Sequence, residues 1–393
     1  ARETAVHIAE TMNASVVLGS ATPSVESYYR AFKGEYTLLK LSERAAGASM
    51  PAVYTVDLRE ELKSGNRSIF SRKLRSLMED RLSKSQQIML FLNKRGYAGF
   101  ISCRSCGHVF KCPHCDISLT YHRDGRLVCH YCGYEETAPK VCPKCGSKYV
   151  SGFRAGTQQI EEMINREFPS ARVLRMDMDT TSGKEGHEKI LSRFANHEAD
   201  ILVGTQMIVK GHDFPDVTLV GVLAADMSLY GSDYRAAERT FQLLVQASGR
   251  AGRAEKSGEV VIQSYTPEHY SIVAAAANDY EGFYEEEISY RKLLGYPPVN
   301  NMLQVMFSSD DRQRLEEACN DIKTWCTDSW ADNRISAAGP VPAQVYKIKD
   351  VYSQILCVRS ADYKSLTEFK DSVEMYIRSK DMYSNIIVQY AFN

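Results

Sequence analysis

Eight of the eleven cysteines stand between residues 103 and 145, where they form four C-x-x-C pairs. A C-x-x-C pair can turn tightly and direct two thiolates toward one ion. Eight thiolates are enough for two tetrahedral sites with four sulfur ligands each, which is the usual arrangement of structural zinc. The chain opens without the basic-then-apolar pattern of an export signal, and in such a chain this spacing favours metal over disulfides. The pairs are Cys103/Cys106, Cys112/Cys115, Cys129/Cys132 and Cys142/Cys145.

Three of the pairs are followed at once by glycine, at Gly107, Gly133 and Gly146. Glycine permits the positive φ with which such a turn ends. Redox-active pairs are the alternative interpretation, but four pairs in one short stretch favour metal. His114 and His130 are alternative ligands, although eight thiolates favour histidines that face outward. Four thiolates around each ion leave no open coordination position, so the zinc is expected to be structural and not catalytic.

The pairing of the cysteines follows from the segment between the second and third pairs. Asp124-Gly125 is flanked by residues that favour strands, which predicts a hairpin. The hairpin brings Cys112/Cys115 beside Cys129/Cys132 and leaves the outer pairs to meet each other. We therefore predict nested pairing. Sequential pairing, in which the first two pairs share an ion, is tighter and stays open at this point.

A second kind of chemistry is indicated by loops that follow strands or helices. Gly204-Thr205 follows an apolar run, and Gly249 through Arg253 follows a helix. Glycine amides and threonine hydroxyls suit phosphate oxygens. Arg250 and Arg253 are three residues apart, so on a helical turn they share a face that suits a triphosphate. Taken singly, each loop is as well explained by a helix cap or by solvated arginines.

The elements expected to position these loops alternate between short apolar runs and amphipathic stretches. This alternation predicts a parallel sheet with helices on both faces, in which ligands bind beyond the carboxyl ends of strands. The predicted strands are Ser15–Gly19, Ala52–Asp57, Gln87–Leu92, Tyr149–Phe153, Arg172–Met176, Asp200–Gly204, Val217–Leu223 and Gly258–Tyr265. The predicted helices are Thr157–Phe168, Lys184–Asn196 and Tyr234–Ser248.

The C-terminal region has a different pattern. Residues 267–287 read as one long helix, and the acidic run 285–287 reads as its solvated face. Leu294 through Pro298 then marks a boundary. Beyond it the elements follow a β-α-β-β-α-β order, which predicts a split βαβ sandwich. Tyr346, Lys347 and Lys349 are candidates for a nucleic-acid contact, although an exposed, solvated hairpin explains them better. Cys319, Cys326 and Cys357 are expected to be ordinary buried thiols.

Length and composition bound the class of protein. The chain has 393 residues, of which 44% are hydrophobic and 25% charged, and its net charge is −1. These values predict a globular protein of two or three domains, and no apolar run is long enough for a membrane span. A nearly neutral chain needs local patches to bind nucleic acid. The chain opens inside an amphipathic stretch, which predicts a fragment, and we expect it in the cytoplasm.

The order of the loops resembles the later motifs of superfamily-two helicases. Residues 20–22 resemble the S-A-T motif that ends the first motor lobe, 205–213 the fifth motif, and 246–253 the sixth, Q-x-x-G-R-x-G-R. With the cysteine-rich insertion, the whole chain resembles the primosomal protein N′ (PriA) family of replication-restart helicases. The stretches 18–24, 210–219 and 339–343 carry the most specific part of that resemblance.

The resemblance implies a role for each residue that matches a motif. Arg250 and Arg253 would reach the γ-phosphate, and Gln246 would couple nucleotide to DNA. Asp213, with Gly211, would contact the nucleotide. The remaining motif residues, which would bind the tracked DNA strand or link its movement to hydrolysis, are Thr205, Lys210, Ser20 and Thr22.

The resemblance also implies a function. The family is an ATP-dependent 3′-to-5′ DNA helicase that recognises stalled forks and helps assemble the primosome. Its cofactors are two structural zinc ions with ATP and Mg²⁺, and its partners are forked and single-stranded DNA, single-stranded DNA-binding protein and other primosome proteins. It also has nested zinc pairing. Two other readings are a non-catalytic zinc-ribbon protein that binds nucleic acid or partners, and a different superfamily-two helicase that remodels recombination forks.

One departure from the family is large. The sequence contains no G-x-x-x-x-G-K-[S/T] loop and no D-E-x-H string, so this chain alone is not expected to hydrolyse ATP. The implied organisation is the end of a first lobe (1–45), a RecA-like second lobe (46–100 and 147–266), a zinc insertion (101–146), a helical linker (267–298) and a C-terminal α+β domain (299–393). Residues 1–45 are expected to pack poorly, to show high mobility or to dock on a neighbouring chain.

Overall fold

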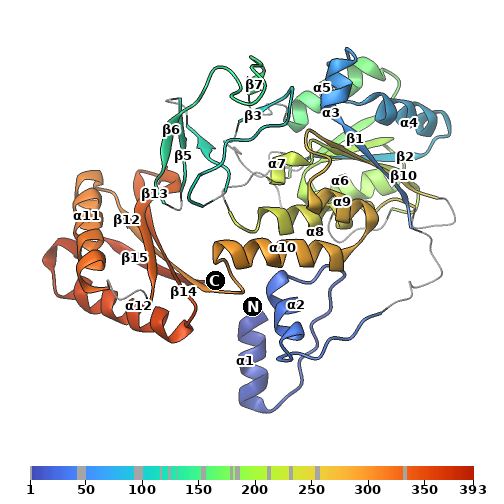
Figure 1. Ribbon diagram of the computed structural model, residues 1–393. Helices are drawn as coiled ribbons and strands as arrows, with labels where there is room; N and C mark the ends of the chain where they lie inside the picture. The colour runs from blue at the N-terminus through green and yellow to red at the C-terminus, as the bar shows by residue number, and fades with distance from the viewer. Residues whose placement is uncertain are drawn as a thin grey trace. The chain divides into compact units, whose positions relative to one another are not determined.

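The computed structural model divides the chain into two compact units, Ala1–Lys40 and Leu41–Asn393 (Figure 1). The residues that it describes are 2–41, 50–92, 101–115, 117–122, 125–130, 132–151, 156–177, 180–181, 186–209, 214–229, 233–252, 257–330 and 334–393. None of the helices within these ranges has the length and apolar character needed to cross a bilayer.

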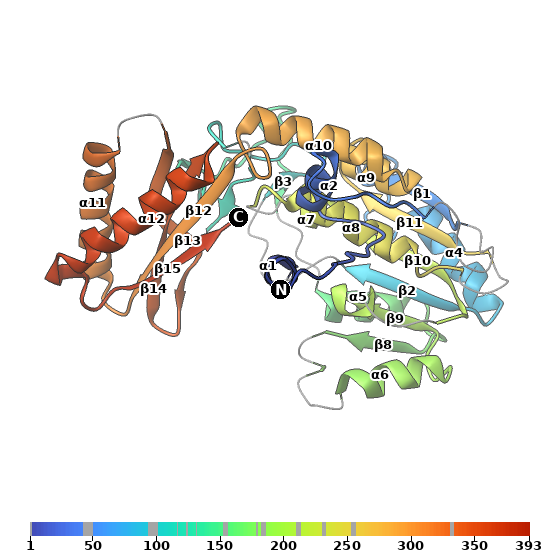
Figure 2. The same ribbon diagram turned by 90° about the horizontal axis from the view of Figure 1, so that it is seen from below.

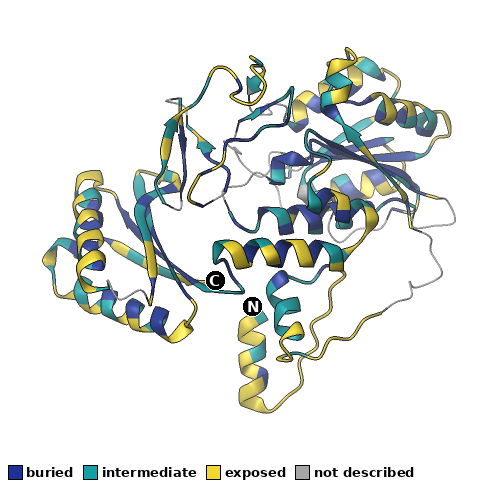
Figure 3. Cartoon of the chain, viewed as in Figure 1, coloured by how far each residue is buried: buried dark blue, intermediate teal, exposed yellow. Residues whose placement is uncertain are grey.

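The first unit contains two helices, α1 (Arg2–Met12) and α2 (Val25–Phe32). They are linked to each other by Arg30, which donates to Glu3 at 3.0 Å. Most of this unit is exposed, and Val17 retains 88% of its accessible surface (Figure 3). The predicted strand Ser15–Gly19 is wrong, because this segment pairs with no strand among the described residues. An apolar run forms a strand only where a neighbouring strand accepts its hydrogen bonds.

Six parallel strands form the main sheet of the second unit. We call this sheet, with the helices that cover it, the α/β lobe. The order of the strands is β1-β11-β10-β2-β9-β8, and Figure 2 shows the last five one below another. Their bounds are β1 (Ala52–Asp57), β2 (Gln87–Leu92), β8 (Val173–Met176), β9 (Ile201–Gly204), β10 (Val217–Leu223) and β11 (Glu259–Ser264). The strands predicted at all six places are confirmed. β2, β9 and β10 are buried along their whole length, as expected for a parallel sheet covered on both faces.

Helices cover both faces of this sheet. Apolar residues of α4 (Arg72–Ser83) and α5 (Thr157–Glu167) join alternate residues of the central strands in one core. On the other face α8 (Ala236–Ser248) lies against β10, and α6 (Gly186–Ala195) lies beside β8. Connections between parallel strands are right-handed, so the direction of a connection along the sheet decides which face its helix covers. α4 and α5 lead toward the β8 edge of the sheet, whereas α6 and α8 lead toward the β1 edge, and the two pairs therefore lie on opposite faces. The predicted α/β class is confirmed.

The buried side-chain amide of Gln263 fixes the start of α4. Gln263 on β11 accepts a hydrogen bond from the backbone N–H of Ser71 at 2.7 Å and donates to the carbonyl of Ile69 at 2.8 Å. Ser71 is the N-cap of α4 and accepts from the N–H of Leu74. Two short helices, α3 (Leu58–Lys63) and α7 (Asp226–Leu229), complete the lobe.

The cysteine module, residues 101–151, contains only short strands. β3 (Ser102–Cys103) pairs with β7 (Val150–Ser151). β4 (Thr120–Tyr121) pairs with β5 (Arg126–Val128), and β5 with β6 (Glu135–Thr137). The antiparallel pairing of β4 with β5 confirms the predicted hairpin, and Asp124 of its turn lies outside the described residues. The strand predicted at Tyr149–Phe153 is described only over β7.

The terminal domain, residues 301–393, is a four-stranded antiparallel sheet of order β13-β14-β12-β15 with two helices (orange to red in Figure 1). Its strands are β12 (Asn301–Ser309), β13 (Ser336–Ile348), β14 (Val351–Ser360) and β15 (Ile387–Phe392). α11 (Arg312–Ser329), α12 (Tyr363–Arg378) and the short η3 (Asp381–Tyr383) share one core with the sheet. The predicted split βαβ order is confirmed, and so is the hairpin turn, where Lys349 and Asp350 both have positive φ.

Two expectations for the segment before this domain are wrong. The single helix predicted at 267–287 is two helices, α9 (Tyr270–Ala277) and α10 (Tyr280–Leu294). α9 ends at Asn278, whose left-handed conformation stops the helix. The acidic run is not wholly solvated either, since Glu287 is completely buried.

Candidate functional site

The four C-x-x-C pairs form turns with the same hydrogen bonds. The N–H of the first cysteine donates to the carbonyl five residues on, as in Cys103 to His108 and Cys142 to Ser147. In the three pairs followed by glycine, the glycine N–H donates back to the carbonyl of the first cysteine. Gly107, Gly133 and Gly146 all have positive φ, between 71° and 80°. The prediction that glycine ends each of these turns is confirmed.

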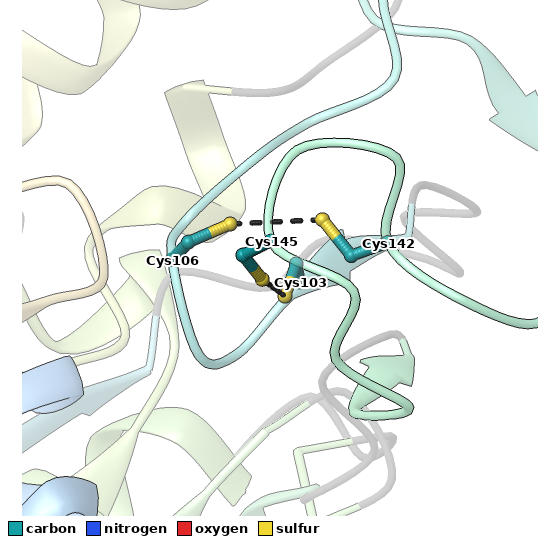
Figure 4. Close-up of side chains that lie close together, drawn as sticks. All are labelled: Cys103, Cys106, Cys142 and Cys145. Atoms are coloured by element: carbon teal, nitrogen blue, oxygen red, sulfur yellow. Dashed lines mark hydrogen bonds between the residues drawn. The ribbon is translucent and has the colours of Figure 1, made fainter.

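The eight thiols gather into two clusters in the nested arrangement. Cluster 1 contains Cys103, Cys106, Cys142 and Cys145, and cluster 2 contains Cys112, Cys115, Cys129 and Cys132. Within each cluster all sulfur atoms lie within 4.8 Å of one another. Figure 4 shows the side chains of cluster 1 converging from two turns that are far apart in sequence. Nested pairing is confirmed, and sequential pairing is excluded.

The sulfur separations fit a tetrahedral zinc ion. The Sγ atoms of Cys103 and Cys145 are 3.6 Å apart, those of Cys106 and Cys142 also 3.6 Å, and those of Cys112 and Cys132 3.4 Å. A zinc–sulfur distance of about 2.3 Å implies sulfur separations of about 3.8 Å in a tetrahedron. Both clusters are therefore consistent with structural zinc held by four thiolates.

Ionisation of the thiols is opposed by burial and helped by the turns. Burial disfavours the thiolate of Cys103, but hydrogen bonds from the N–H groups of Cys106 and Ser105 and from nearby thiols lower its pKa to about 7. At Cys112 burial dominates and raises the pKa to about 12. A bound divalent cation would supply the positive charge that keeps all four thiolates ionised.

The two histidines lie outside the ligand sets, as expected. His114 is exposed and packs edge-on against Tyr134, with ring centroids 5.8 Å apart. His130 does not face outward: it is 4% exposed, and its Nδ1 donates to the carbonyl of Pro342 in the terminal domain at 2.8 Å. Burial lowers the pKa of His130, so a neutral imidazole makes this contact.

Cluster 2 belongs to a core shared by three parts of the second unit. Its cysteines pack with Tyr234 of the α/β lobe, with Tyr296 beyond the end of α10, and with Met302 and Cys357 of the terminal domain. Cys319, Cys326 and Cys357 are buried, as predicted. Cluster 1 is more open, since Cys145 is exposed and Cys106 partly exposed.

The motif residues of the α/β lobe lie at two ends of its sheet. Thr205 follows the carboxyl end of β9 and is partly exposed. Gln246 and Arg250 stand at the C-terminal end of α8, also partly exposed, and the N–H of Gly252 donates to the carbonyl of Val217 at the start of β10 at 3.1 Å. Measured along the strands, these two ends of the sheet are about five residues, or roughly 17 Å, apart. Of the two loops, the one that contains Thr205 lies at the carboxyl ends of the strands, where ligands are expected to bind, and the one that contains Arg250 does not.

The segment between β9 and β10 connects these two ends. Its first part is a short 3-10 helix, η2 (Gln206–Val209), which contacts both β2 and α8. Lys210, Gly211, Asp213 and Arg253, which sequence reasoning also assigned to the site, lie outside the described residues. Ser20 and Thr22 belong to the first unit, where the Ser20 hydroxyl accepts from the N–H of Thr22 at 3.1 Å.

Sequence reasoning missed a buried carboxyl group, that of Asp226, and a buried ion pair centred on Arg291. Burial raises the pKa of Asp226, which accepts hydrogen bonds from the Ser264 hydroxyl and from the N–H groups of Tyr265 and Thr266 and so fixes the end of β11. In the ion pair, Arg291 on α10 donates to Glu238 on α8 at 2.7 Å. Only the spacing of Arg291 four residues after Glu287 was visible in the sequence, as a candidate helical ion pair.

Three family models match this chain. The PriA DNA helicase Cys-rich region domain matches residues 112–136, the helicase conserved C-terminal domain matches 148–255, and the primosomal protein N C-terminal domain matches 292–388. The first match covers all four cysteines of cluster 2, and the second contains Thr205, Gln246 and Arg250.

Curated relatives match along nearly the whole chain. Replication restart protein PriA of Bacillus subtilis is 52% identical over 357 residues, which are 90% of this chain and 44% of that protein. Replication restart protein PriA of Synechocystis is 44% identical over 368 residues, 91% of this chain and 44% of that protein. The chain thus spans less than half the length of these relatives. With the two four-cysteine clusters, the helicase C-terminal domain and the terminal domain all present, the chain belongs to the family of replication restart protein PriA.

Proposed function

We propose that this chain supplies the second motor lobe, the zinc module and the C-terminal domain of an ATP-dependent 3′-to-5′ DNA helicase that restarts replication. In that role the intact protein recognises stalled forks and helps assemble the primosome in the cytoplasm. The observation that carries the proposal is the position of Arg250. It stands just beyond the end of α8, within the matched helicase domain, and is partly exposed.

We assign the motif residues to contacts with the nucleotide, to contacts with DNA, or to the link between the two. Arg250 and Arg253, with Gln246, face a nucleotide whose β-phosphate and Mg²⁺ are held by a first lobe. Asp213 and Gly211 contact that nucleotide from the loop before β10. Thr205 and Lys210 bind the tracked DNA strand. In the first unit, Ser20 and Thr22 link hydrolysis to strand movement.

Physical chemistry supports this assignment of Arg250. Charge builds up on the transferred phosphoryl group and its neighbours during cleavage, and a planar guanidinium can donate two parallel hydrogen bonds to phosphate oxygens. Arg250 lies just beyond the C-cap Gly249, where the chain leaves the helix. In this scheme ATP and Mg²⁺ bind only when the first lobe is present.

The partners proposed for the intact protein are forked and single-stranded DNA, single-stranded DNA-binding protein and other primosome proteins. The net charge of −1 gives no general attraction to DNA, so binding would depend on local groups. The zinc module and the terminal domain are the proposed carriers of fork and partner recognition.

The test uses a longer polypeptide in which this chain is preceded by a first lobe with a G-x-x-x-x-G-K-[S/T] loop. We expect Arg250→Ala to lower DNA-stimulated ATP hydrolysis by roughly 10³-fold or more, as found for arginines that contact a transferring phosphoryl group. Arg312→Ala, on an exposed face of α11, serves as the control and should leave the rate unchanged.

The other outcomes are equally informative. An unchanged rate in Arg250→Ala, with fork binding intact, would reject the motor assignment in favour of a zinc-ribbon binding protein. The present chain alone should show no hydrolysis above background. Duplexes with a single-stranded tail at one end or the other test the proposed 3′-to-5′ direction, because only one of the two should be unwound.

A further inference from the structure

Tyr296 touches three parts of the second unit at once. Its hydroxyl donates to the carbonyl of Cys115, a ligand of cluster 2, at 3.0 Å. Its ring stacks on Tyr234 of the α/β lobe, with centroids 5.0 Å apart and planes 7° from parallel. The guanidinium of Arg359, on β14 of the terminal domain, lies 5.3 Å from the same ring. Tyr296 itself has no accessible surface, so these contacts are dry.

A second set of contacts joins cluster 2 directly to the terminal domain. His130, next to the ligand Cys129, donates to the carbonyl of Pro342 on β13 at 2.8 Å. Gly133, which ends the turn of Cys129 and Cys132, lies so close to β13 that a Cβ atom there would stand 2.6 Å from a methyl group of Val341. The turn and the strand therefore fit each other with no space for an added methyl group.

A third set runs from Tyr296 to α8, the helix that carries Gln246 and ends just before Arg250. The N–H of Tyr296 donates to the carbonyl of Arg291 at 2.9 Å. The Arg291 side chain has no accessible surface, lies 5.1 Å from the ring of Tyr234 and donates to Glu238 of α8 at 2.7 Å. A buried, charged hydrogen bond of this kind holds both helices to one geometry.

Cluster 1 lacks comparable contacts with the terminal domain within the described ranges. Cys145 is exposed, and a Cβ atom at Gly146 would meet nothing within 4 Å. Its contacts close the cysteine module on itself, as in the hydrogen bond between the hydroxyls of Ser105 and Ser147 at 2.8 Å. At Gly107 it also touches the backbone of Tyr265 in the α/β lobe.

From these contacts we infer that the two zinc sites have different tasks. The zinc of cluster 2 is the joint between the α/β lobe and the terminal domain. Through Tyr296 and Arg291 it also holds the first turn of α8, where Glu238 lies. The zinc of cluster 1 closes the cysteine module locally. This inference goes beyond the proposed function, because the joint exists whether or not the lobe acts as a motor.

The test removes one ligand from each cluster in the full zinc-loaded chain and follows amide hydrogen exchange. Cys132→Ser and Cys106→Ser are matched, because both residues are partly exposed and both are the second cysteine of a pair. Each variant should hold one zinc instead of two. We expect Cys132→Ser to speed exchange by tenfold or more in residues 291–302 and 338–345. Cys106→Ser should do so only within 101–111 and 139–151.

A second pair of variants leaves every ligand in place. Gly133→Ala and Gly146→Ala impose similar backbone strain, since φ is 80° at the first and 71° at the second. Only the methyl group at residue 133 meets the terminal domain. Gly133→Ala should therefore speed exchange in 338–345, and Gly146→Ala should leave that segment protected.

If loss of a cluster 2 ligand unfolds the whole chain, Tyr296→Phe still tests whether cluster 2 joins the α/β lobe to the terminal domain. It removes only the hydroxyl that reaches Cys115 and should retain two zinc ions. Exchange should rise in 115–119 and 294–300, whereas Tyr149→Phe, whose side chain is 62% exposed, should change neither segment. Unchanged protection in Tyr296→Phe, or the same exchange pattern in Cys132→Ser and Cys106→Ser, would overturn the inference.

Discussion

Arg291 on α10 places its guanidinium between two carboxylates, donating from Nε to Glu287 of its own helix and from a terminal nitrogen to Glu238 of α8, each at 2.7 Å. Its other terminal nitrogen donates to the carbonyl of Pro297 at 3.0 Å. Glu287 receives a further hydrogen bond from the hydroxyl of Tyr270 on α9, at 2.6 Å. Three helices are thus tied together by one buried cation.

Replacing this cation should be costly. Arg291→Met leaves two carboxylates buried without their partner, and breaking a buried pair from one side typically costs about 3–5 kcal/mol. We expect a large fall in the urea midpoint of unfolding followed by circular dichroism. Arg312→Met removes an exposed arginine that pairs with Glu316 and should leave the midpoint nearly unchanged. Similar midpoints for the two variants would show that the buried group does not stabilise the fold.

His269 gives the fold a specific pH dependence. It is the N-cap of α9, and its Nδ1 accepts a hydrogen bond from the N–H of Ser271, which requires the neutral imidazole. Burial, with a smaller contribution from Lys111, lowers the pKa of His269 from 6.5 to about 4. Between pH 6.5 and 4 the unfolded chain therefore binds the proton more readily than the folded chain. Stability should fall as the pH is lowered through this window.

The matched variant for this prediction is His269→Asn, because asparagine also caps helices but does not titrate in this range. The difference in melting temperature between the parent chain and the variant, recorded at half-unit steps of pH, isolates the histidine contribution. That difference should shift in favour of the variant as the pH falls from 6.5 to 4. A difference that stays constant with pH would contradict a buried, neutral His269.

Gly107 and Gly146 offer a comparison within cluster 1. Both end a turn of the cluster with similar φ, 74° and 71°, so alanine should strain the backbone of either by about 1–2 kcal/mol. At Gly107 the new Cβ would also stand 2.6 Å from the carbonyl oxygen of Tyr265, whereas at Gly146 it meets open space. We expect Gly107→Ala to lower the thermal midpoint clearly more than Gly146→Ala. Equal shifts would mean that the close approach to Tyr265 does not constrain this turn.

Zinc should leave the two clusters at different rates. Cluster 1 contains the exposed Cys145 and the partly exposed Cys106, whereas only Cys132 is partly exposed in cluster 2. A chromogenic chelator added in excess should therefore release one zinc quickly and one slowly. Cys106→Ser should remove the fast phase and leave the slow one. A single phase carrying both ions would contradict the difference in access.

Much of the metal site was predictable from local sequence. The C-x-x-C spacing predicted the eight candidate ligands, and Asp124-Gly125 predicted the hairpin that favours nested pairing, because turn chemistry depends on a few neighbouring residues. The six strands of the α/β lobe were predictable for a similar reason, since each is a short apolar run. Local sequence patterns of this kind do not show which other segment of the chain packs against each face of a strand or helix.

The errors came from contacts between distant segments. Glu287 read as part of a solvated run, but it is buried because Arg291 and Tyr270 neutralise and bind it. Tyr296 read as part of a chain break, although it stacks on Tyr234, sixty-two positions earlier. The apolar residues 15–19 found no strand to pair with among the described residues. No local periodicity reports such partners.

The order of the main sheet constrains how the protein can be made. Among the strands that the structure describes, β1 pairs with β11 alone, so that Val53 lies beside Val260. During synthesis the first strand must wait with both edges unpaired until the ribosome has released some two hundred further residues. The cysteine module emerges within that interval and can take up its metal while the sheet around it is still open. A strand that waits with both edges unpaired is prone to aggregate, so the order of this sheet exposes the protein to that risk during synthesis.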